Sequence, residues 1–282
     1  MPLALITGAS TGIGRASALR LAADGWTVLA GVRASEAGEE LIRRAASPRV
    51  IPVTLDVTDA AQVAGAAGAV ARSAGASSAG GLDALVNNAG IGVGGPLELV
   101  TQHDLQRQFE VNVFGQVSVI QAMLPALRRS RGRIILVSSI GGRVAMAYTA
   151  PYAASKHALE AIGDCLRVEL ADSGVTVAII EPGAVATPIW AKNRADAERL
   201  VIPAELSGDY GHVPAALERV LERTGRRGVP PEQVADTIAG ALAAPRMRAR
   251  YLVGRDARAM LLARRILPDH LFDRFARRAL GV

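Results

Sequence analysis

A tyrosine and a lysine four residues apart, Tyr152 and Lys156, are the side chains of this chain whose types and spacing best fit chemistry. The residues that follow them, through Leu170, carry apolar side chains at helical spacing, and two residues four apart on a helix share one face. A phenol and an ammonium group can therefore point into one cleft. Because a nearby cation favours the phenolate, we expect Lys156 to lower the pKa of Tyr152 from about 10, so that the phenol can give or take a proton.

Ser139 is the expected helper of this pair. It lies thirteen residues before Tyr152, at the end of the apolar run 133–137, which predicts a buried strand. Open α/β sheets bind ligands at the carboxyl ends of their strands, where Ser139 would lie. A Tyr and a Lys four apart also occur by chance on solvated helices, so the surrounding motifs must separate the two interpretations.

Apolar runs alternate with helical patterns along the chain, which predicts one α/β unit. We expect a doubly wound Rossmann fold, with a seven-stranded, mostly parallel sheet and helices on both faces. Residues 1–255 would form the catalytic domain, and 256–282 a basic helical tail. The predicted strands are 3–7, 27–32, 50–54, 84–86, 133–137, 176–180 and 251–253, and the predicted helices begin near Ile13, Ala37, Ala60, Gln102, Tyr152 and Pro231.

Composition narrows the class of protein. No stretch of about 18 uncharged apolar residues is present, and the first residues read as a strand, not as a signal peptide. The single cysteine, Cys165, lies on an apolar helix, where we expect it to fill the core, and one cysteine suits a reducing, cytoplasmic location. The four histidines lack ligand spacing, so we expect no catalytic metal.

The net charge of +6 belongs to one end of the chain. Ten Arg and three Asp lie between Arg246 and the C-terminus, so this segment carries +7 and the remainder about −1. A basic tail on a nearly neutral body weakens a nucleic-acid-binding interpretation, and we expect no nucleic-acid partner.

A glycine-rich loop, Thr7–Gly14, follows the first predicted strand and opens the first predicted helix. Glycines let backbone N–H groups approach a pyrophosphate at a helix N-terminus, where the helix dipole favours anions. The alternative is an ordinary turn, and three residues between the first two glycines is not the common dinucleotide spacing. The predicted cofactor contacts of this loop are Gly8, Ser10, Thr11, Gly12, Ile13 and Gly14.

Polar and small residues follow three further strands. Asp56 and Val57 end the third strand, where a carboxylate can accept a hydrogen bond from an adenine amino group; a helix cap, which Thr58 or Asp59 could also supply, is the alternative. After the fourth strand, Asn88, Ala89 and Gly90 leave room for a flat ring and a ribose, unless they form a plain turn. After the sixth strand, the chain turns back over the cleft, and its predicted cofactor contacts are Pro182, Gly183, Val185 and Thr187.

Asn112 lies inside an apolar helical run, where an asparagine is unfavourable unless its amide has a partner. A structural water, or a kink that the amide stabilises, would be such a partner. A buried Asn that only holds the helix is the alternative, and the two interpretations are compatible.

In this order and spacing, the motifs resemble those of the short-chain dehydrogenase/reductase family, single-domain type, from Leu3 to about Val253. The resemblance implies an NAD(P)-dependent oxidoreductase acting on alcohols and carbonyls. In this family, the residue at Tyr152 is the general acid or base, and Lys156 lowers its pKa and binds the nicotinamide ribose. Ser139 would bind the substrate oxygen, and Asn112 would hold a water that links Lys156 to solvent.

The end of the second predicted strand bears on cofactor choice. Members of this family that use NAD usually carry an acid there, whereas this chain has Val32 followed by Arg33. A guanidinium can grip a 2′-phosphate, so NADP is favoured over NAD. Two features oppose this: Thr11 stands where some NADP members carry a second basic residue, and residues 28–58 resemble the retinol and steroid dehydrogenase branch, several members of which use NAD.

A lid at about 188–229 is expected to cover the substrate. Its aromatic and aliphatic residues predict a lipophilic alcohol and its ketone or aldehyde, such as a steroid or retinoid, unless they only pack the lid onto the body. Two alternatives remain: a 3-oxoacyl-carrier-protein reductase, and a non-catalytic protein that senses its cofactor.

The tail predicts an amphipathic helix. It could pack on the body, pack on a second subunit, or rest on an anionic membrane as a peripheral contact. By analogy with the family, we expect a homodimer or homotetramer. The residues on the apolar face of this helix are Leu271, Phe272, Phe275, Ala276, Ala279 and Leu280.

Overall fold

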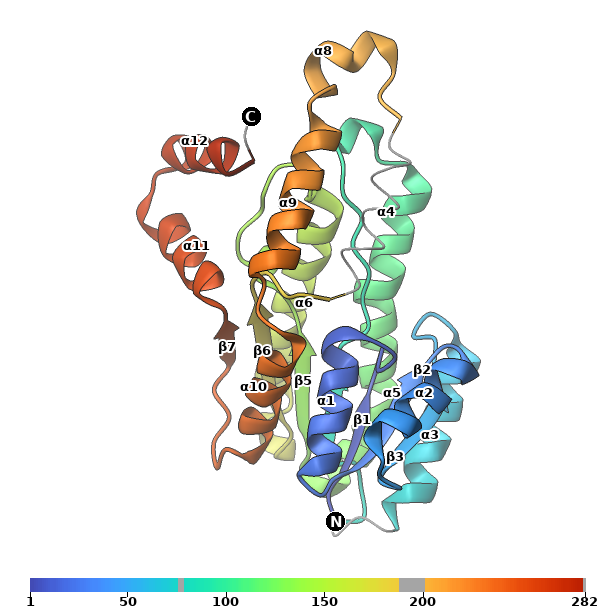
Figure 1. The fold of residues 1–282 in the computed structure, drawn as a ribbon. Helices are drawn as coiled ribbons and strands as arrows, with labels where there is room; N and C mark the ends of the chain where they lie inside the picture. Colours follow the sequence, from blue (N-terminus) through green and yellow to red (C-terminus); the bar gives the residue numbers. More distant parts are fainter. Residues whose placement is uncertain (76–78, 188–200, 281–282) are drawn as a thin grey trace.

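A computed structural model describes residues 1–75, 79–187 and 201–280 of the chain. The described residues form one seven-stranded sheet in the order β3-β2-β1-β4-β5-β6-β7 (Figure 1). The predicted fold class is confirmed, and every strand pair is parallel. The strands are β1 (Leu3–Ile6), β2 (Thr27–Val32), β3 (Val50–Thr54), β4 (Ala84–Asn87), β5 (Arg133–Val137), β6 (Thr176–Pro182) and β7 (Arg250–Val253).

Helices cover both faces of the sheet, because the strands are apolar on both sides. Alternate residues of β1 illustrate this: Ala4 and Ile6 join the core under α1, α2 and α10, while Leu3 and Leu5 join the core under α3, α5 and α6. The helices are α1 (Gly12–Ala23), α2 (Ser35–Ala45), α3 (Ala60–Ala74), α4 (Gln102–Phe109), α5 (Gly115–Ser130), α6 (Ala150–Glu169), α8 (Ser207–Tyr210), α9 (Val213–Arg227), α10 (Pro231–Ala243), α11 (Arg255–Ile266) and α12 (Asp269–Leu280).

The register of the sheet aligns the carboxyl ends of its central strands. Ile6 of β1 pairs with Val86 of β4, and Val137 of β5 pairs with Ile180 of β6. The loops that follow these four strands therefore meet at one edge of the sheet, where open parallel sheets bind ligands.

The helix predicted to begin at Gln102 is one continuous run with an irregular centre. A π-helical turn, Glu110–Phe114, joins α4 to α5, and it contains Asn112. Single π-helical turns inside α-helices are frequent at functional sites.

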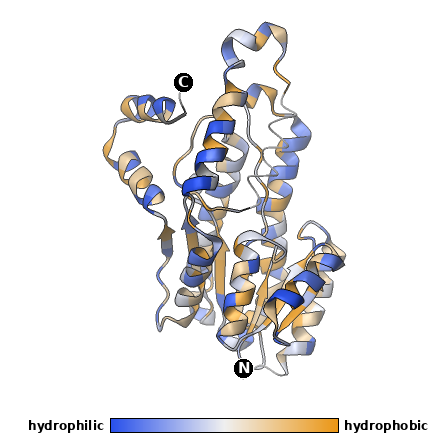
Figure 2. Ribbon diagram, viewed as in Figure 1, coloured by the Kyte–Doolittle hydropathy of each residue, from blue (hydrophilic) through white to orange (hydrophobic). Residues whose placement is uncertain are grey.

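The C-terminal tail forms a hairpin of two helices, α11 and α12, outside the sheet (Figure 1). Phe272 and Ala276 of α12 are buried against Val144, so part of the predicted apolar face packs on the body. Leu271 and Phe275 of the same predicted face are exposed. The side chains of Ala279 and Leu280 lie outside the described residues. Figure 2 shows the alternation of hydrophilic and hydrophobic residues along this hairpin.

The structure also bears on the single cysteine and on membrane-spanning segments. Cys165 is exposed on α6 and does not fill the core, because it lies on the side of the helix that faces away from the sheet. Among the residues that the structure describes, no helix combines the length and the apolar character needed to cross a membrane.

Candidate active site

Helix α6 positions the Tyr152–Lys156 pair. The helix begins at Ala150, two residues earlier than predicted, with Pro151 in its first turn, where the missing N–H of proline costs nothing. Lys156 is 4% exposed, and its Nζ donates a hydrogen bond of 2.9 Å to the carbonyl oxygen of Val137 on β5. Nζ also lies 5.9 Å from the centre of the Tyr152 ring. The ammonium group is therefore tied to the sheet edge beside the phenol.

Ser139 lies next to Tyr152, as its place after β5 predicted. Its backbone is extended, and its hydroxyl oxygen accepts a hydrogen bond of 3.0 Å from the N–H of Gly141. A methyl group added to Gly141 would lie 3.2 Å from Cε1 of Tyr152 and 3.5 Å from the Ser139 hydroxyl oxygen. Gly141 therefore packs closely against both side chains, where a larger residue would crowd them.

The electrostatics of the pair differ from the sequence expectation. In the structure, burial raises the pKa of Tyr152 above 10.0, and the neighbouring Ser139 hydroxyl opposes this shift. Burial also lowers the pKa of Lys156 from 10.5 to about 8, against the opposing charge of Glu160. Loss of solvation acts on both groups, since each is harder to charge away from water. The lowering of the Tyr152 pKa by Lys156 is therefore not found in the chain on its own.

Asn112 joins three elements of the site. Its Nδ2 donates to the Ile91 carbonyl at 2.9 Å and to the Ser155 hydroxyl at 3.1 Å, and its Oδ1 accepts from the Ile91 N–H at 2.9 Å. A methyl group on Gly90 would lie 3.3 Å from Asn112 Oδ1 and 3.7 Å from Lys156 Nζ. Asn112 therefore holds the loop after β4 against α6, which is the structural interpretation; its role toward a water stays a prediction.

The glycine-rich loop has the backbone that a phosphate site requires. Gly8 and Gly12 have φ angles of +65° and +55°, which residues other than glycine rarely adopt. A methyl group on Gly14 would overlap with the Gly8 carbonyl oxygen. The Thr11 side chain does not cap α1, so the first N–H groups of this helix have no side-chain partner there. Ser10 and Ile13 are half-buried in the same loop.

Asn88 fastens the glycine-rich loop to the next strand end. Its Nδ2 donates to the carbonyl oxygens of Thr7 at 2.9 Å and Gly8 at 3.2 Å. The buried Thr7 hydroxyl accepts from the N–H groups of both Asn88 and Ala89 at 2.9 Å. These bonds hold the loops after β1 and β4 together, so the predicted contact residues of the two loops lie side by side.

Asp56, Val57 and Arg33 lie at the ends of β3 and β2. The cap of α3 comes from Asp59, whose side chain accepts from the N–H groups of Ala61 and Gln62. Asp56 instead accepts from the N–H and hydroxyl of Thr58, and Val57 is buried. Arg33 is exposed and makes no ion pair with any residue that the structure describes.

The chain after β6 turns back as predicted. Pro182 ends the strand, and a methyl group on Gly183 would overlap with the Asp256 carboxylate, which accepts from the Ala184 N–H at 2.7 Å. Val185 is buried and bridges to Val229 in parallel. Thr187 is half-buried. The predicted lid begins next, and residues 188–200 lie outside the described residues.

The described part of the predicted lid contacts the segments after β4 and β5. The Tyr210 hydroxyl donates to Glu98 at 2.9 Å, and the Tyr148 hydroxyl lies 3.2 Å from Nε2 of His212. Tyr148 is four residues before Tyr152 and has a φ of +64°. These polar contacts at exposed side chains fix α8 and the start of α9 above the loops that carry Ser139 and Gly90.

A buried group of charged residues below Lys156 was not predicted from the sequence. Glu160 and Glu181 are buried, and Arg250 on β7 contacts both, with Nε–O distances of 3.1 Å each. The signal was available, because the spacing of four that joins Tyr152 to Lys156 continues to Glu160.

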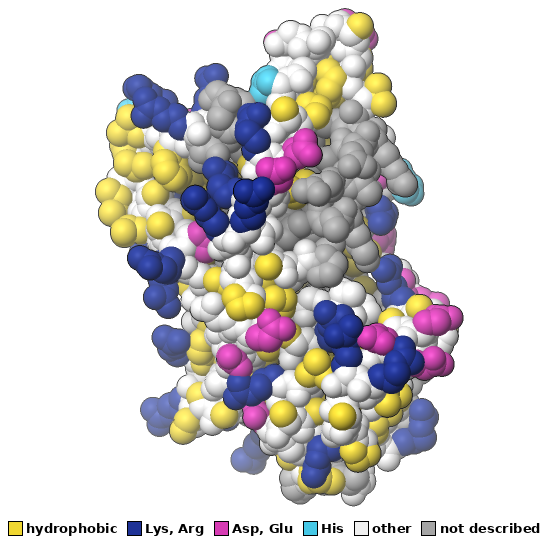
Figure 3. Space-filling view, viewed as in Figure 1, with side chains coloured by type: hydrophobic (Ala, Val, Ile, Leu, Met, Phe, Trp, Pro, Cys, Tyr) yellow, Lys and Arg dark blue, Asp and Glu magenta, His cyan; other side chains and the backbone are white. Residues whose placement is uncertain are grey.

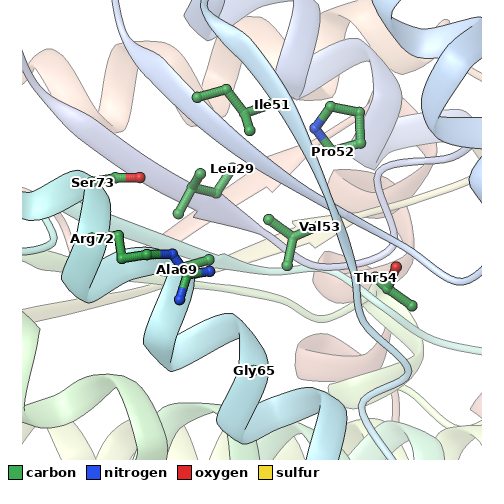
Figure 4. A pocket seen from close by; sticks show the side chains of 9 residues that line it. All are labelled: Leu29, Ile51, Pro52, Val53, Thr54, Gly65, Ala69, Arg72 and Ser73. Atoms are coloured by element: carbon green, nitrogen blue, oxygen red, sulfur yellow. The ribbon is translucent and has the colours of Figure 1, made fainter.

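A hollow also lies away from these residues. A space of about 400 Å³ lies between β3 and α3, where Leu29, Ile51 and Val53 face Ala69 and Arg72 (Figure 4). None of the predicted site residues lines it. Among the described residues, no three His, Cys, Asp or Glu side chains gather as metal ligands, and the absence of a catalytic metal stays a prediction.

Known proteins match the chain over nearly its whole length. A family model described as short chain dehydrogenase matches residues 2–198. An NADPH-dependent 3-dehydrocapnine reductase of Ornithobacterium rhinotracheale is 34% identical over 280 residues, covering 97% of this chain and 95% of that protein. Retinol dehydrogenase 5 of Mus musculus is 37% identical over 287 residues, covering 95% and 85%.

Solved structures agree with these relatives. A short-chain dehydrogenase/reductase from Burkholderia phymatum in complex with NAD has a TM-score of 0.78 and 29% identity, covering 94% of this chain and 92% of that one. A short-chain dehydrogenase from Burkholderia cenocepacia in complex with NADP has a TM-score of 0.73 and 27% identity, covering 100% and 98%.

Proposed function

Because the chain belongs to the short-chain dehydrogenase family and is an oxidoreductase, we propose that it interconverts a lipophilic alcohol and its ketone or aldehyde with a nicotinamide cofactor. One observation carries the proposal. Tyr152, Ser139 and Lys156 meet around Gly141 and at the carboxyl end of β5, beside the glycine-rich loop.

The residues of the loop fit a dinucleotide. The positive φ angles of Gly8 and Gly12, the space that only glycine leaves at position 14, and the uncapped start of α1 together favour a bound pyrophosphate. Asn88 and Thr7 hold this loop in place without using those N–H groups.

Three side chains of this protein do the protein's part of the reaction. A bound nicotinamide would supply the hydride acceptor or donor. Tyr152 gives its proton to the carbonyl oxygen of the substrate during reduction and takes it from the hydroxyl during oxidation. Ser139 donates a hydrogen bond to the same oxygen, where negative charge develops. Lys156 Nζ lies 5.9 Å from the centre of the Tyr152 ring, where its charge would favour the phenolate form; in the chain on its own, burial sets the direction of the Tyr152 pKa shift.

We propose NADP as the preferred cofactor. Arg33 stands exposed at the end of β2 without an ion-pair partner among the described residues, so it can contact a 2′-phosphate without first breaking an internal bond. The solved relatives include complexes with NADP and with NAD, so both cofactors belong in the test.

The lipophilic character of the substrate is supported by the relatives. Relatives are named for retinol, 17-beta-hydroxysteroid and 3-dehydrocapnine substrates. The experiment is a panel of steroids, retinoids, long-chain ketones and aldehydes and one acyl thioester, each with NADPH and NADH, followed by absorbance of the reduced nicotinamide. Turnover of the thioester alone would favour a 3-oxoacyl-carrier-protein reductase.

We further propose that the α11–α12 hairpin rests on an anionic membrane surface. Leu262 and Ile266 of α11, and Leu271 and Phe275 of α12, are exposed pairs at helical spacing. Figure 3 shows hydrophobic side chains gathered on this part of the surface, with Lys or Arg side chains around them. A self-associating contact would bring this basic surface against its own copy, whereas anionic lipid headgroups complement it. The exposed arginines of the hairpin include Arg258, Arg265, Arg274 and Arg278.

A further inference from the structure

One turn beyond Lys156, helix α6 carries a buried acid on the same face. Tyr152, Lys156 and Glu160 follow one another at a spacing of four residues, so their side chains stack along one side of the helix. Glu160 is 5% exposed, and Lys156 is 4% exposed. Two opposite charges are thus withdrawn from water one helical turn apart, directly below the phenol.

The position of Glu160 is set by its neighbours. Arg250 on β7 donates to Glu160 Oε2 at 3.1 Å, and it also donates to Asp164 at 2.7 Å. A methyl group on Gly142 would lie 2.7 Å from the Ser138 hydroxyl oxygen and 3.0 Å from Cγ of Glu160, so this carboxyl group is packed between β5 and the turn after it. Its other oxygen, Oε1, accepts no hydrogen bond from the described residues.

We propose that Glu160 is a positioning residue for the reaction, whose buried carboxylate keeps the Lys156 ammonium group charged beside Tyr152. This inference rests on the proposed function of Lys156. A buried lysine without a counter-charge loses its proton more easily, whereas an acid one turn away favours the charged form.

The other charges around Glu160 do not replace it. Arg143 contacts Glu181 at 2.8 Å, and Arg250 contacts Glu181 at 3.1 Å, so Glu181 on β6 is bound by two guanidinium groups. Asp164 is bound by Arg250 at 2.7 Å and is a further helical turn away from Lys156. Both carboxylates are therefore paired with arginines and not with Lys156. Without Glu160, the turn of α6 that follows Lys156 would contain no acid.

The direction of the pKa shifts agrees with this role. Burial lowers the pKa of Lys156 to about 8, and Glu160 raises it against that effect. Burial, together with the charge of Glu181, raises the pKa of Glu160 to about 7, while Ser138 and Arg250 favour its ionised form. Both groups are therefore charged together between about pH 7 and pH 8, and acidification below this range discharges the acid first.

The composition of the chain makes the charge on Lys156 directly measurable. The sequence contains two lysines, Lys156 and Lys192. In a full-length Lys192→Arg background labelled with ¹³C-lysine, the single lysine ¹³Cε signal reports Lys156, and its change with pH gives the titration midpoint. No substrate or cofactor is needed, so failure here is distinguishable from failure of the proposed reaction.

We expect Glu160→Gln to move this midpoint to lower pH by on the order of one unit, because the neutral amide keeps the shape but not the charge. Glu169→Gln is the matched control: it removes an exposed acid from the same helix, and the midpoint should stay where it is. Turnover of Glu160→Gln should fall at a lower pH than that of the parent chain, by the same interval.

A purely structural role gives a different result. Glu160→Gln would then lower Tm while leaving the Lys156 midpoint equal to that of Glu169→Gln, and this outcome overturns the proposal. Should Glu160→Gln not fold, Glu160→Asp keeps the charge but withdraws it by one methylene. We expect a smaller shift in the same direction for Glu160→Asp, and an unchanged midpoint in that variant also overturns the proposal.

Discussion

Lys156 Nζ lies 5.9 Å from the centre of the Tyr152 ring while donating a hydrogen bond of 2.9 Å to the carbonyl oxygen of Val137. The lysine is thus anchored to the end of β5, and the tyrosine stands one helical turn before it on α6. Helix and strand meet at the sheet edge that also holds the glycine-rich loop. Changes at either residue should act on proton transfer, not on the fold of the loop.

Tyr152→Phe is expected to reduce turnover by about 10²–10⁴-fold, because it removes the proton that general acid–base catalysis transfers. Binding of NADPH, measured by its fluorescence, should stay within about threefold, since the glycine-rich loop is untouched. Tyr210→Phe is the control, because it removes a phenol hydroxyl that donates to Glu98 and lies on α8. Equal turnover in the two variants would remove Tyr152 from the mechanism.

The pKa of Lys156, about 8, predicts how turnover depends on pH. The ammonium group is charged below this value and neutral above it, so carbonyl reduction should fall as pH rises through about 8. The same pKa shift also makes the free energy of unfolding depend on pH. Because the group titrates at 10.5 when unfolded, its burial destabilises the fold below about pH 8, and the penalty is relieved between pH 8 and 10.5. A pH–rate profile that stays flat to pH 10 would contradict the first expectation.

Arg33→Ala should raise the KM for NADPH by about tenfold or more, because a charge-assisted contact to the 2′-phosphate is lost, and should leave the KM for NADH nearly unchanged. Arg44→Ala is a suitable control, since Arg44 is an exposed arginine of α2 that pairs with Glu40 at 2.7 Å. If both cofactors respond equally to Arg33→Ala, this residue does not select between them.

Gly14→Ala and Gly240→Ala should act in opposite directions. A methyl group at position 14 would overlap with the Gly8 carbonyl oxygen, so we expect lower stability and loss of NADPH binding. A methyl group at position 240, inside α10, meets nothing within 4 Å. There the substitution should stabilise the chain by about 0.5–1 kcal/mol, through helix propensity alone. Thermal unfolding and NADPH fluorescence measure both, and equal changes in the two variants would show that the loop is not sterically constrained.

Leu262→Ser combined with Phe275→Ser should reduce binding to vesicles that contain anionic lipid, because exposed apolar area is lost. Point substitutions are preferable to truncation, since removal of α12 would uncover Val144. Replacing Arg258, Arg265, Arg274 and Arg278 by Gln should weaken binding at about 1 kcal/mol per arginine and reduce its salt dependence.

Ile42→Ser serves as the control for the hairpin, because it removes an exposed apolar side chain from α2. Flotation with neutral and anionic vesicles measures binding, and sedimentation velocity measures the oligomeric state. A change of oligomeric state on Leu262→Ser with Phe275→Ser, without a change in flotation, would identify the surface as a contact between subunits instead.

The strands, the glycine-rich loop and the Tyr152–Lys156 pair could be predicted from the sequence, because each depends on residues close together along the chain. Short apolar runs alternating with helical patterns predicted the strands of a parallel sheet, and β2, β3 and β5 have the bounds that the pattern predicts. The glycines between Thr7 and Gly14 marked a tight loop, because positive φ angles and close backbone contacts tolerate little else. The four-residue spacing of Tyr152 and Lys156 placed them on one face, since helix geometry requires it.

The tertiary structure decided what depends on neighbours distant in sequence. The pKa of Tyr152 is raised because α6 packs on the sheet and excludes water, an effect that spacing along one helix does not contain. Arg250 reaches Glu160 across 90 positions of the chain, so the buried charges below Lys156 exist only once β7 joins β6. Likewise, Phe272 is buried and Phe275 exposed on one predicted apolar face, because Val144 meets only part of it.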